Sequence, residues 1–114
     1  MRLSQIDAPE TGHGKGNPGQ PFGQRSKQSL SDLVYEREVR ADCETRDKYG
    51  RQICTVWIGS TDANLEQVRR GMAWLYRKYA RDPSYYLAEE EVKRAGRGLW
   101  SDPGAMPPWE WRHR

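Results

Sequence analysis

Four charged residues of this sequence have the types and the spacing that hydrolysis of a phosphodiester would require: Arg2, Asp7, Glu10 and Arg51. Asp7 supplies a hard oxygen ligand for Ca²⁺, and Glu10 can orient or deprotonate an attacking water molecule. The two guanidinium groups can bind non-bridging phosphate oxygens, whose negative charge grows in the transition state. Two ion pairs on the surface would use the same residue types, so the spacing alone leaves both interpretations open.

The first ten residues must position three of these four side chains. Leu3 and Ile6 give the segment strand character, and Pro9 ends the strand because proline lacks an N–H donor and restricts the residue before it. Asp7 and Glu10 therefore lie at the exit of a short strand. A capping box of the same two carboxylates is the alternative. The glycine- and proline-rich sequence that follows cannot continue a helix, which favours a metal or proton-transfer site.

The remaining sequence predicts an α+β fold. Apolar residues at helical spacing predict helices over residues 21–35 and 63–70 and a final helix that begins at residues 82–84 and extends to Leu99. Alternating apolar and polar residues predict strands over 38–47 and 51–58, which the turn at 47–50 joins into a hairpin. The order of strand, helix, two strands, helix and helix does not suggest a Rossmann unit.

The last predicted helix has an apolar face and a charged face. The apolar positions recur at spacings of three and four residues, and we expect them to be buried: Tyr85, Ala88, Val92, Ala95 and Leu99. The charged face carries two favourable i,i+4 pairs, Glu89 with Lys93 and Glu90 with Arg94. We interpret this face as solvated rather than as a functional site.

Cations alternate with tyrosine just before that helix, in the segment from Arg77 to Arg81. Such a segment can bind a phosphate-bearing strand while Tyr79 stacks on a base. A solvated edge over buried rings would have the same composition. Both interpretations stay open.

Cys43 and Cys54 are the only cysteines, and their spacing does not suit a metal site. They lie at equal distances from the centre of the predicted turn, so they face each other across the hairpin, and a disulfide can form in an oxidising compartment. Two buried free thiols are the preferred interpretation, because cysteine is among the most often buried residues. His13, in the glycine-rich loop, carries no predicted role.

The composition is that of one small domain, residues 1–114, with 35% hydrophobic residues and a net charge of +3. The basic balance makes an anionic partner more plausible than a cationic one. The sequence contains no transmembrane run and no secretory pattern, so no membrane partner is expected and the compartment stays undetermined. The proline- and tryptophan-rich tail, residues 101–114, is expected to lie against the surface of the domain.

A set of motifs in this order resembles the staphylococcal nuclease (thermonuclease) family. The motifs run through nearly the whole chain: Arg2-Leu3, Ile6-Asp7-Ala8-Pro9-Glu10, Asp47-Lys48-Tyr49-Gly50-Arg51, Val68-Arg69-Arg70-Gly71-Met72-Ala73-Trp74, Gly98-Leu99-Trp100-Ser101 and Pro107-Pro108-Trp109-Glu110-Trp111-Arg112. The resemblance implies an OB-fold, a five-stranded β-barrel with three helices. It also implies Ca²⁺-dependent hydrolysis of DNA and RNA with little sequence preference.

The resemblance assigns roles to individual residues. It implies that the catalytic residues are Arg2, Glu10 and Arg51. It implies that Ca²⁺ is held by Asp7, by the backbone carbonyl of Ala8 and, through a water molecule, by Glu10. It further implies that Lys48, Tyr49 and Tyr79 bind the nucleic-acid substrate.

The sequence departs from the family pattern at its beginning. Family members start with further strands, one of which carries a second calcium carboxylate, and no such segment precedes Met1 here. We therefore expect an incomplete barrel with weakened calcium affinity. Either the sequence is part of a longer protein, or a partner chain completes the sheet, for example as a homodimer formed by strand exchange.

Three functional hypotheses follow. The first is a calcium-dependent nuclease acting on single-stranded DNA and RNA. The second is a nucleic-acid-binding module with weak or no catalysis, which the missing metal strand would explain. The third is a scaffold domain that binds protein through its tyrosines and tail tryptophans. Members of the resembled family are often secreted or periplasmic.

Overall fold

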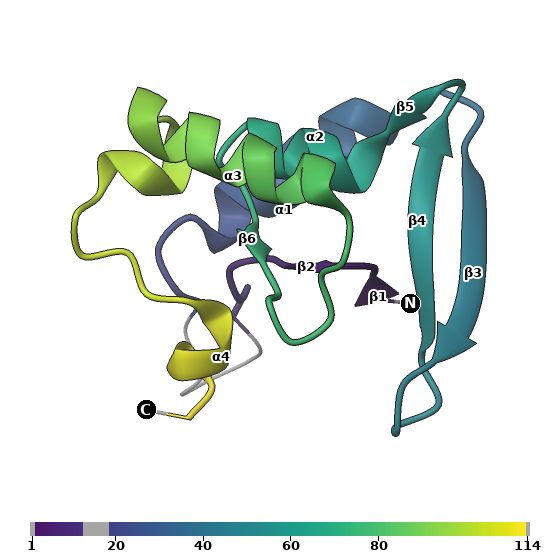
Figure 1. Ribbon diagram of the computed structural model, residues 1–114, viewed down its shortest axis with the longest axis horizontal. Helices are drawn as coiled ribbons and strands as arrows, with labels where there is room; N and C mark the ends of the chain where they lie inside the picture. The colour runs from purple at the N-terminus through teal and green to yellow at the C-terminus, as the bar shows by residue number, and fades with distance from the viewer. Residues whose placement is uncertain (1, 13–18, 114) are drawn as a thin grey trace.

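The computed structural model in Figure 1 describes residues 2–12 and 19–113, so His13 lies outside the described residues. Helices and strands are both present, which confirms the α+β prediction. The strands are β1 (Arg2–Leu3), β2 (Ile6–Asp7), β3 (Arg40–Arg46), β4 (Gln52–Ile58), β5 (Thr61–Asp62) and β6 (Trp74–Leu75). The helices are α1 (Gly23–Val34), α2 (Ala63–Arg69), α3 (Pro83–Ala95), the 3-10 helix η1 (Gly98–Ser101) and α4 (Pro108–Trp111).

The strands form two open sheets rather than the five-stranded barrel that the family resemblance implies. In the larger sheet β1 pairs parallel with β4, β3 pairs antiparallel with β4, and β5 pairs with the end of β4. In the smaller sheet β2 pairs antiparallel with β6. A barrel requires every strand to be paired on both sides. Within the described residues β3 is paired on one side only, so the sheet does not close.

The β3–β4 hairpin places Cys43 opposite Cys54, as predicted, and the register shifts between Cys43 and Thr45, closer to the turn. The two cysteines form a disulfide with their Cα atoms 4.0 Å apart, so the preferred interpretation as two free thiols was wrong. Cys54 is fully buried. The predicted burial is confirmed for Cys54 only, because Cys43 is half-buried on β3. The register brings the two sulfur atoms together.

Capping residues lie at the start of α2 and at both ends of α3. Asp62 caps α2 by accepting a hydrogen bond from the Leu65 N–H at 3.0 Å, and Asp82 caps α3 through the Ser84 N–H at 2.9 Å. Gly96 ends α3 in the left-handed conformation, with φ of 65°. The short helix α4 adds a turn to the three predicted helices and lies in the tail, near the C-terminus in Figure 1. No helix in the described part of the chain is long and apolar enough to cross a membrane.

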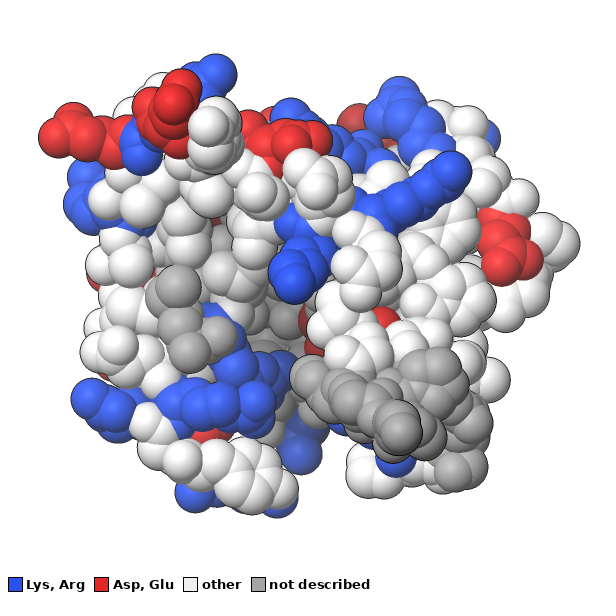
Figure 2. Space-filling view, turned by 180° about the vertical axis from the view of Figure 1, so that it is seen from behind, with Lys and Arg blue, Asp and Glu red and all other residues white. Residues whose placement is uncertain are grey.

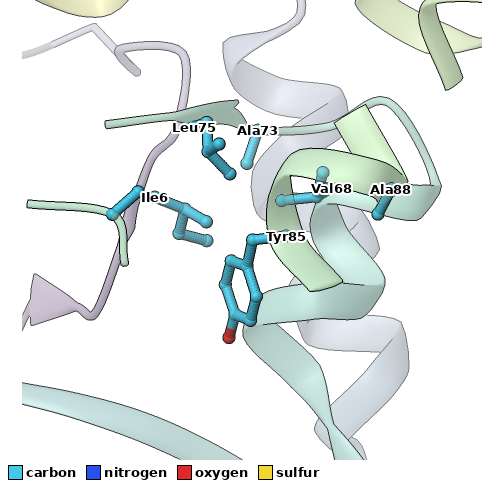
Figure 3. Close-up of a cluster of buried hydrophobic side chains, with 7 residues drawn as sticks. Ile6, Val68, Ala73, Leu75, Tyr85 and Ala88 are labelled. Atoms are coloured by element: carbon cyan, nitrogen blue, oxygen red, sulfur yellow. The ribbon is translucent and has the colours of Figure 1, made fainter. Parts of the chain in front are cut away.

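The main hydrophobic cluster lies where α2 and α3 pack together and against β2 and β6. Figure 3 shows the side chains of Ile6, Val68, Ala73, Leu75, Tyr85 and Ala88 converging from these elements. The predicted burial of Tyr85, Ala88, Val92 and Leu99 is confirmed, although Leu99 lies in η1 rather than in α3. The predicted burial of Ala95 was wrong, because this last residue of α3 is exposed.

Glu89 is buried, contrary to the prediction of a solvated face. Its side chain accepts a hydrogen bond from the Leu75 N–H at 2.9 Å. It also forms an ion pair with Arg77 at 2.6 Å. It also lies 3.4 Å from Lys93, the predicted i,i+4 partner. Because β6 packs against α3, this carboxylate satisfies a backbone donor of β6 and holds Arg77 close to α3.

Candidate active site

The pairing of β2 with β6 places Asp7 in the interior. Asp7 lies opposite Trp74 in this two-stranded sheet, and only 9% of its surface is exposed. Pro9, which is also buried, then turns the chain toward Glu10. The strand exit predicted from the sequence thus delivers both carboxylates to one place.

A single guanidinium group bridges the two carboxylates, and it belongs to Arg112 at the other end of the chain. One Nη of Arg112 donates to Oδ2 of Asp7 at 2.7 Å. The other Nη lies 3.4 Å from Oδ1 of Asp7 and also donates to Oε1 of Glu10. Asp7 and Glu10 therefore share the Arg112 guanidinium as a partner. A capping box would not require the two carboxylates to share a cation.

The charges around Asp7 act in opposite directions. Burial raises the pKa of the Asp7 carboxyl, while the hydrogen bonds and charge of Arg112, and the charge of Arg2, lower it. The net direction is upward. The Arg112 guanidinium has its pKa raised above the usual value, chiefly by its hydrogen bonds to Asp7. Because its charge acts on the Asp7 carboxyl, Arg2 belongs to the same cluster.

Gln20 fixes the backbone of Glu10. The side-chain oxygen of Gln20 accepts a hydrogen bond from the Glu10 N–H at 2.8 Å. The backbone N–H of Gln20 donates to the Glu10 carbonyl at 2.9 Å. The Gln20 amide then donates to the carbonyl of Met106 at 2.8 Å. One buried side chain therefore ties the Glu10 turn to the tail.

Aromatic rings hold Arg2 in place. Its guanidinium lies 5.2 Å from the centre of the Tyr76 ring. Tyr76 stacks on Trp109 with ring centres 5.4 Å apart, and Tyr79 meets Tyr76 edge to face at 5.2 Å. Tyr79 remains 49% exposed. The structure thus connects the predicted stacking residue Tyr79 to the predicted catalytic residue Arg2.

The remaining predicted residues lie at the tip of the β3–β4 hairpin. Arg51 pairs with Asp47 at 2.8 Å, and Arg51 and Lys48 both lie over the ring of Tyr49, which is 73% exposed. The hairpin tip and α4 stand apart in Figure 1, and no contact joins Arg51 to Asp7 or Glu10 among the described residues. Basic side chains gather at this end of the hairpin in the lower left of Figure 2. The predicted site is therefore divided into two parts.

The acidic part of the site offers oxygen donors of the kind that Ca²⁺ prefers. Two carboxylates, Asp7 and Glu10, already converge on a cation, and the backbone carbonyl of Ala8 follows Asp7 directly in the chain. No group of three or more His, Cys, Asp or Glu side chains suitable for a metal occurs within residues 2–12 and 19–113. The donor set thus fits a hard cation in kind but is small.

Arg112, Gln20 and Trp109 were not predicted as residues of the site. Gln20 has no signal in the sequence, because it lies ten positions from Glu10 and the two residues meet only in the folded chain. Arg112 and Trp109 belong to a tail motif that marked the family resemblance, but the motif carried no chemical assignment.

The fold and the site together define a class of protein, and comparison with known families identifies it. The family model described as "Staphylococcal nuclease homologue" matches residues 1–102. The chain belongs to this family. The resemblance stated from the motifs is thereby confirmed.

Several curated proteins are similar over nearly the whole chain. An "Uncharacterized endonuclease" of Haemophilus influenzae is 42% identical over 114 residues, covering all of this chain and 60% of that protein. A "Micrococcal nuclease" of Shigella flexneri is 40% identical over 123 residues, covering 98% of this chain and 67% of that protein. This chain therefore spans about 60 to 67% of the length of these relatives.

Proposed function

We propose that this protein is a calcium-dependent nuclease that hydrolyses phosphodiester bonds of DNA and RNA with little sequence preference. The observation that carries the proposal is that the carboxylates of Asp7 and Glu10 both bind the guanidinium of Arg112. The charge of Arg2 also acts on Asp7. Membership of the staphylococcal nuclease homologue family supports it, as does the 40% identity to a protein named micrococcal nuclease.

The proposed roles follow from the chemistry of each group. Asp7, the Ala8 carbonyl and, through water, Glu10 would hold Ca²⁺, which would supply positive charge close to the phosphate. Glu10 is the candidate general base, because its carboxylate is only partly buried and can reach a water molecule. Arg2 and Arg51 would bind phosphate oxygens and stabilise their growing charge.

Substrate binding is assigned to exposed rings and cations on two loops. Tyr79 and the hairpin residues Lys48 and Tyr49 are accessible to solvent. Stacking on tyrosine rings and contact with phosphates do not distinguish one base from another, since every base has a flat face. This arrangement supports binding of single-stranded DNA and RNA without strong sequence preference.

The experiment that tests the proposal is cleavage of single-stranded DNA with Ca²⁺ and with a chelator in its place. We expect Ca²⁺-dependent cleavage by the native protein and at least a hundredfold loss in Glu10→Gln, because the base is removed. Glu90→Gln, on the exposed face of α3, is the matched control and should cleave normally. Equal cleavage by the native protein and Glu10→Gln would reject the assignment of Glu10.

A nucleic-acid-binding module with weak or absent catalysis is the second candidate. It is favoured by the small donor set and by the presence of Arg112 on both carboxylates. This candidate predicts oligonucleotide binding that survives chelation and weakens steeply with salt, without cleavage. Calcium-dependent cleavage would reject it.

A homodimer formed by strand exchange is a further proposal about partners. It is supported by β3, which is paired only to β4 among the described strands and is almost entirely exposed. Light scattering after size-exclusion chromatography tests it. A molar mass near that of one chain at all concentrations would reject the dimer.

A further inference from the structure

Arg112 contributes a positive charge to the acidic site from within the chain. It engages both carboxylate oxygens of Asp7 and one oxygen of Glu10, and 37% of its side chain is exposed. An arginine that only solubilised the tail would not need to satisfy two separate carboxylates. The contact with Oδ2 of Asp7, at 2.7 Å, has instead the length of a charge-assisted hydrogen bond, and the second Nη is shared between Asp7 and Glu10.

The tail is anchored so that it delivers this guanidinium to the site. Pro108 is fully buried, and Trp109 stacks on Tyr76 and meets Trp74 edge to face with ring centres 6.1 Å apart. The Gln20 amide donates a hydrogen bond to the carbonyl of Met106, which precedes α4 in the chain. The position of Arg112 therefore depends on contacts of the tail that do not involve the carboxylates.

A metal ion that binds Asp7 and Glu10 would interact with the other charges of the cluster. Asp7 and Glu10 carry two negative charges, and Arg112 and Arg2 carry two positive charges. A divalent cation at the same oxygens would lie within a few ångströms of the guanidinium, and like charges at that distance repel strongly in a partly buried site. The metal and Arg112 therefore compete for the same ligands.

We propose that Arg112 is a functional residue of this site: it is the cation that occupies the Asp7–Glu10 pair when no metal is present, and a divalent cation binds by displacing it. Metal binding and the contact between the tail and the carboxylates are then coupled, and each weakens the other by the same factor. The inference rests on the proposed function in one respect, namely that Asp7 and Glu10 are the metal ligands.

The first test is a calorimetric titration with Ca²⁺, without substrate, of four proteins: the native chain, Arg112→Gln, Arg112→Lys and Arg94→Gln. Arg112→Gln removes the competing charge and should bind Ca²⁺ at least about tenfold more tightly than the native chain. Arg112→Lys should lie between them, because an ammonium group cannot bridge both carboxylates as a guanidinium does. Arg94→Gln removes an exposed charge from the end of α3 and should bind like the native protein.

The second readout follows the tail itself. The indole N–H signal of Trp109, assigned in an NMR spectrum by comparison with Trp109→Phe, should shift as Ca²⁺ is added to the native protein. In Arg112→Gln the signal should start near its metal-bound position and shift less. This measurement needs no catalytic activity, and Arg112→Lys gives the same comparison if Arg112→Gln does not fold.

Equal Ca²⁺ affinity in the native protein and both Arg112 variants would overturn the inference, as would weaker binding in Arg112→Gln. The absence of Ca²⁺ binding in every variant would also overturn it. The proposed nuclease function is judged separately by cleavage. Tighter Ca²⁺ binding in Arg112→Gln, without any cleavage by the native protein, would support the inference and reject the nuclease function. Normal cleavage, with the same Ca²⁺ affinity in the native protein and in Arg112→Gln, would support the function and reject the inference.

Discussion

Arg2 and Arg51 have the same predicted role but different surroundings. Arg2 lies against Tyr76 and acts electrostatically on Asp7, so it already belongs to the carboxylate cluster. Arg51 is held by Asp47 and Tyr49 at the hairpin tip. A substrate phosphate would have to bring Arg51 and the carboxylates into one site, either by bridging them or by drawing the hairpin inward.

Replacing Arg51 with alanine should therefore impair turnover far more than folding. Its ion pair with Asp47 is exposed and adds little to stability. Loss of a contact made to the transition state should lower kcat about a hundredfold, while the melting temperature falls by no more than about 4 °C. Arg40→Ala, at the other end of the same hairpin and opposite Trp57, is the control and should leave kcat nearly unchanged. A large fall in melting temperature with normal kcat would contradict the assignment.

At the scale of elements, the beginning of α1 packs directly against the Glu10 turn. A Cβ atom added at Gly23 would lie 2.2 Å from the carbonyl oxygen of Glu10, a distance that no real side chain tolerates. The turn and the helix can approach only because this position lacks a side chain. The position of Glu10 is therefore set partly by α1.

Gly23→Ala should displace this turn. We expect it to lower the free energy of unfolding by about 1–3 kcal/mol, because the added methyl group must push backbone atoms apart. The loss should be accompanied by reduced cleavage, since Glu10 moves. Chemical denaturation and an activity assay measure the two effects. Gly104→Ala is the control, where the nearest atom to an added Cβ lies at an ordinary 3.4 Å, and unchanged stability in Gly23→Ala would contradict the prediction.

The 3-10 helix η1 contributes Leu99 to the interior, where only 2% of its surface is exposed. Leu99→Ala should lower the free energy of unfolding by roughly 2–5 kcal/mol, because it removes buried methyl groups and leaves a cavity. Leu87, which is 55% exposed on α3, provides the matched leucine, and Leu87→Ala should cost no more than ~0.5 kcal/mol. Similar losses in the two variants would show that Leu99 does not belong to the core.

At the scale of the whole molecule, one buried amide connects three elements. The Asn64 side chain at the start of α2 accepts a hydrogen bond from the Val56 N–H at 3.2 Å. It donates to the carbonyls of Ser4 and Cys54, each at 3.1 Å. These contacts join β4, α2 and Ser4, the residue that follows β1, and so connect the strand that carries Arg2 to the rest of the fold.

Asn64→Ala should remove the side-chain partner of the Val56 N–H and of the Ser4 carbonyl, whereas the Cys54 carbonyl keeps its bond from the Ser4 N–H. We expect it to lower the free energy of unfolding by about 2–4 kcal/mol. Urea denaturation followed by circular dichroism measures this loss. Gln28→Ala, which removes an exposed amide bonded to Asp32, should change stability by less than ~0.5 kcal/mol. A comparably small effect in Asn64→Ala would show that water replaces the lost amide.

Much of this architecture follows from local sequence. The caps at Asp62, Asp82 and Gly96 and the register of the hairpin were predictable because each depends on residues close together in the chain. The end of the first strand segment before Pro9, and the position of the carboxylates beside it, were predictable for the same reason. Even the family could be identified at this level, since its motifs are short and ordered.

The sequence by itself thus determined three helices, the β3–β4 hairpin with Cys43 opposite Cys54, and the carboxylates available for chemistry. Only the tertiary structure decided that Glu89 is buried under β6, that the cysteines form a disulfide, and that Arg112 reaches Asp7 across 105 positions of the chain. The division of the predicted site into two parts was decided there as well. The physical reason is that burial and ion pairing depend on which distant surfaces meet, and neither periodicity nor local turn chemistry records that information.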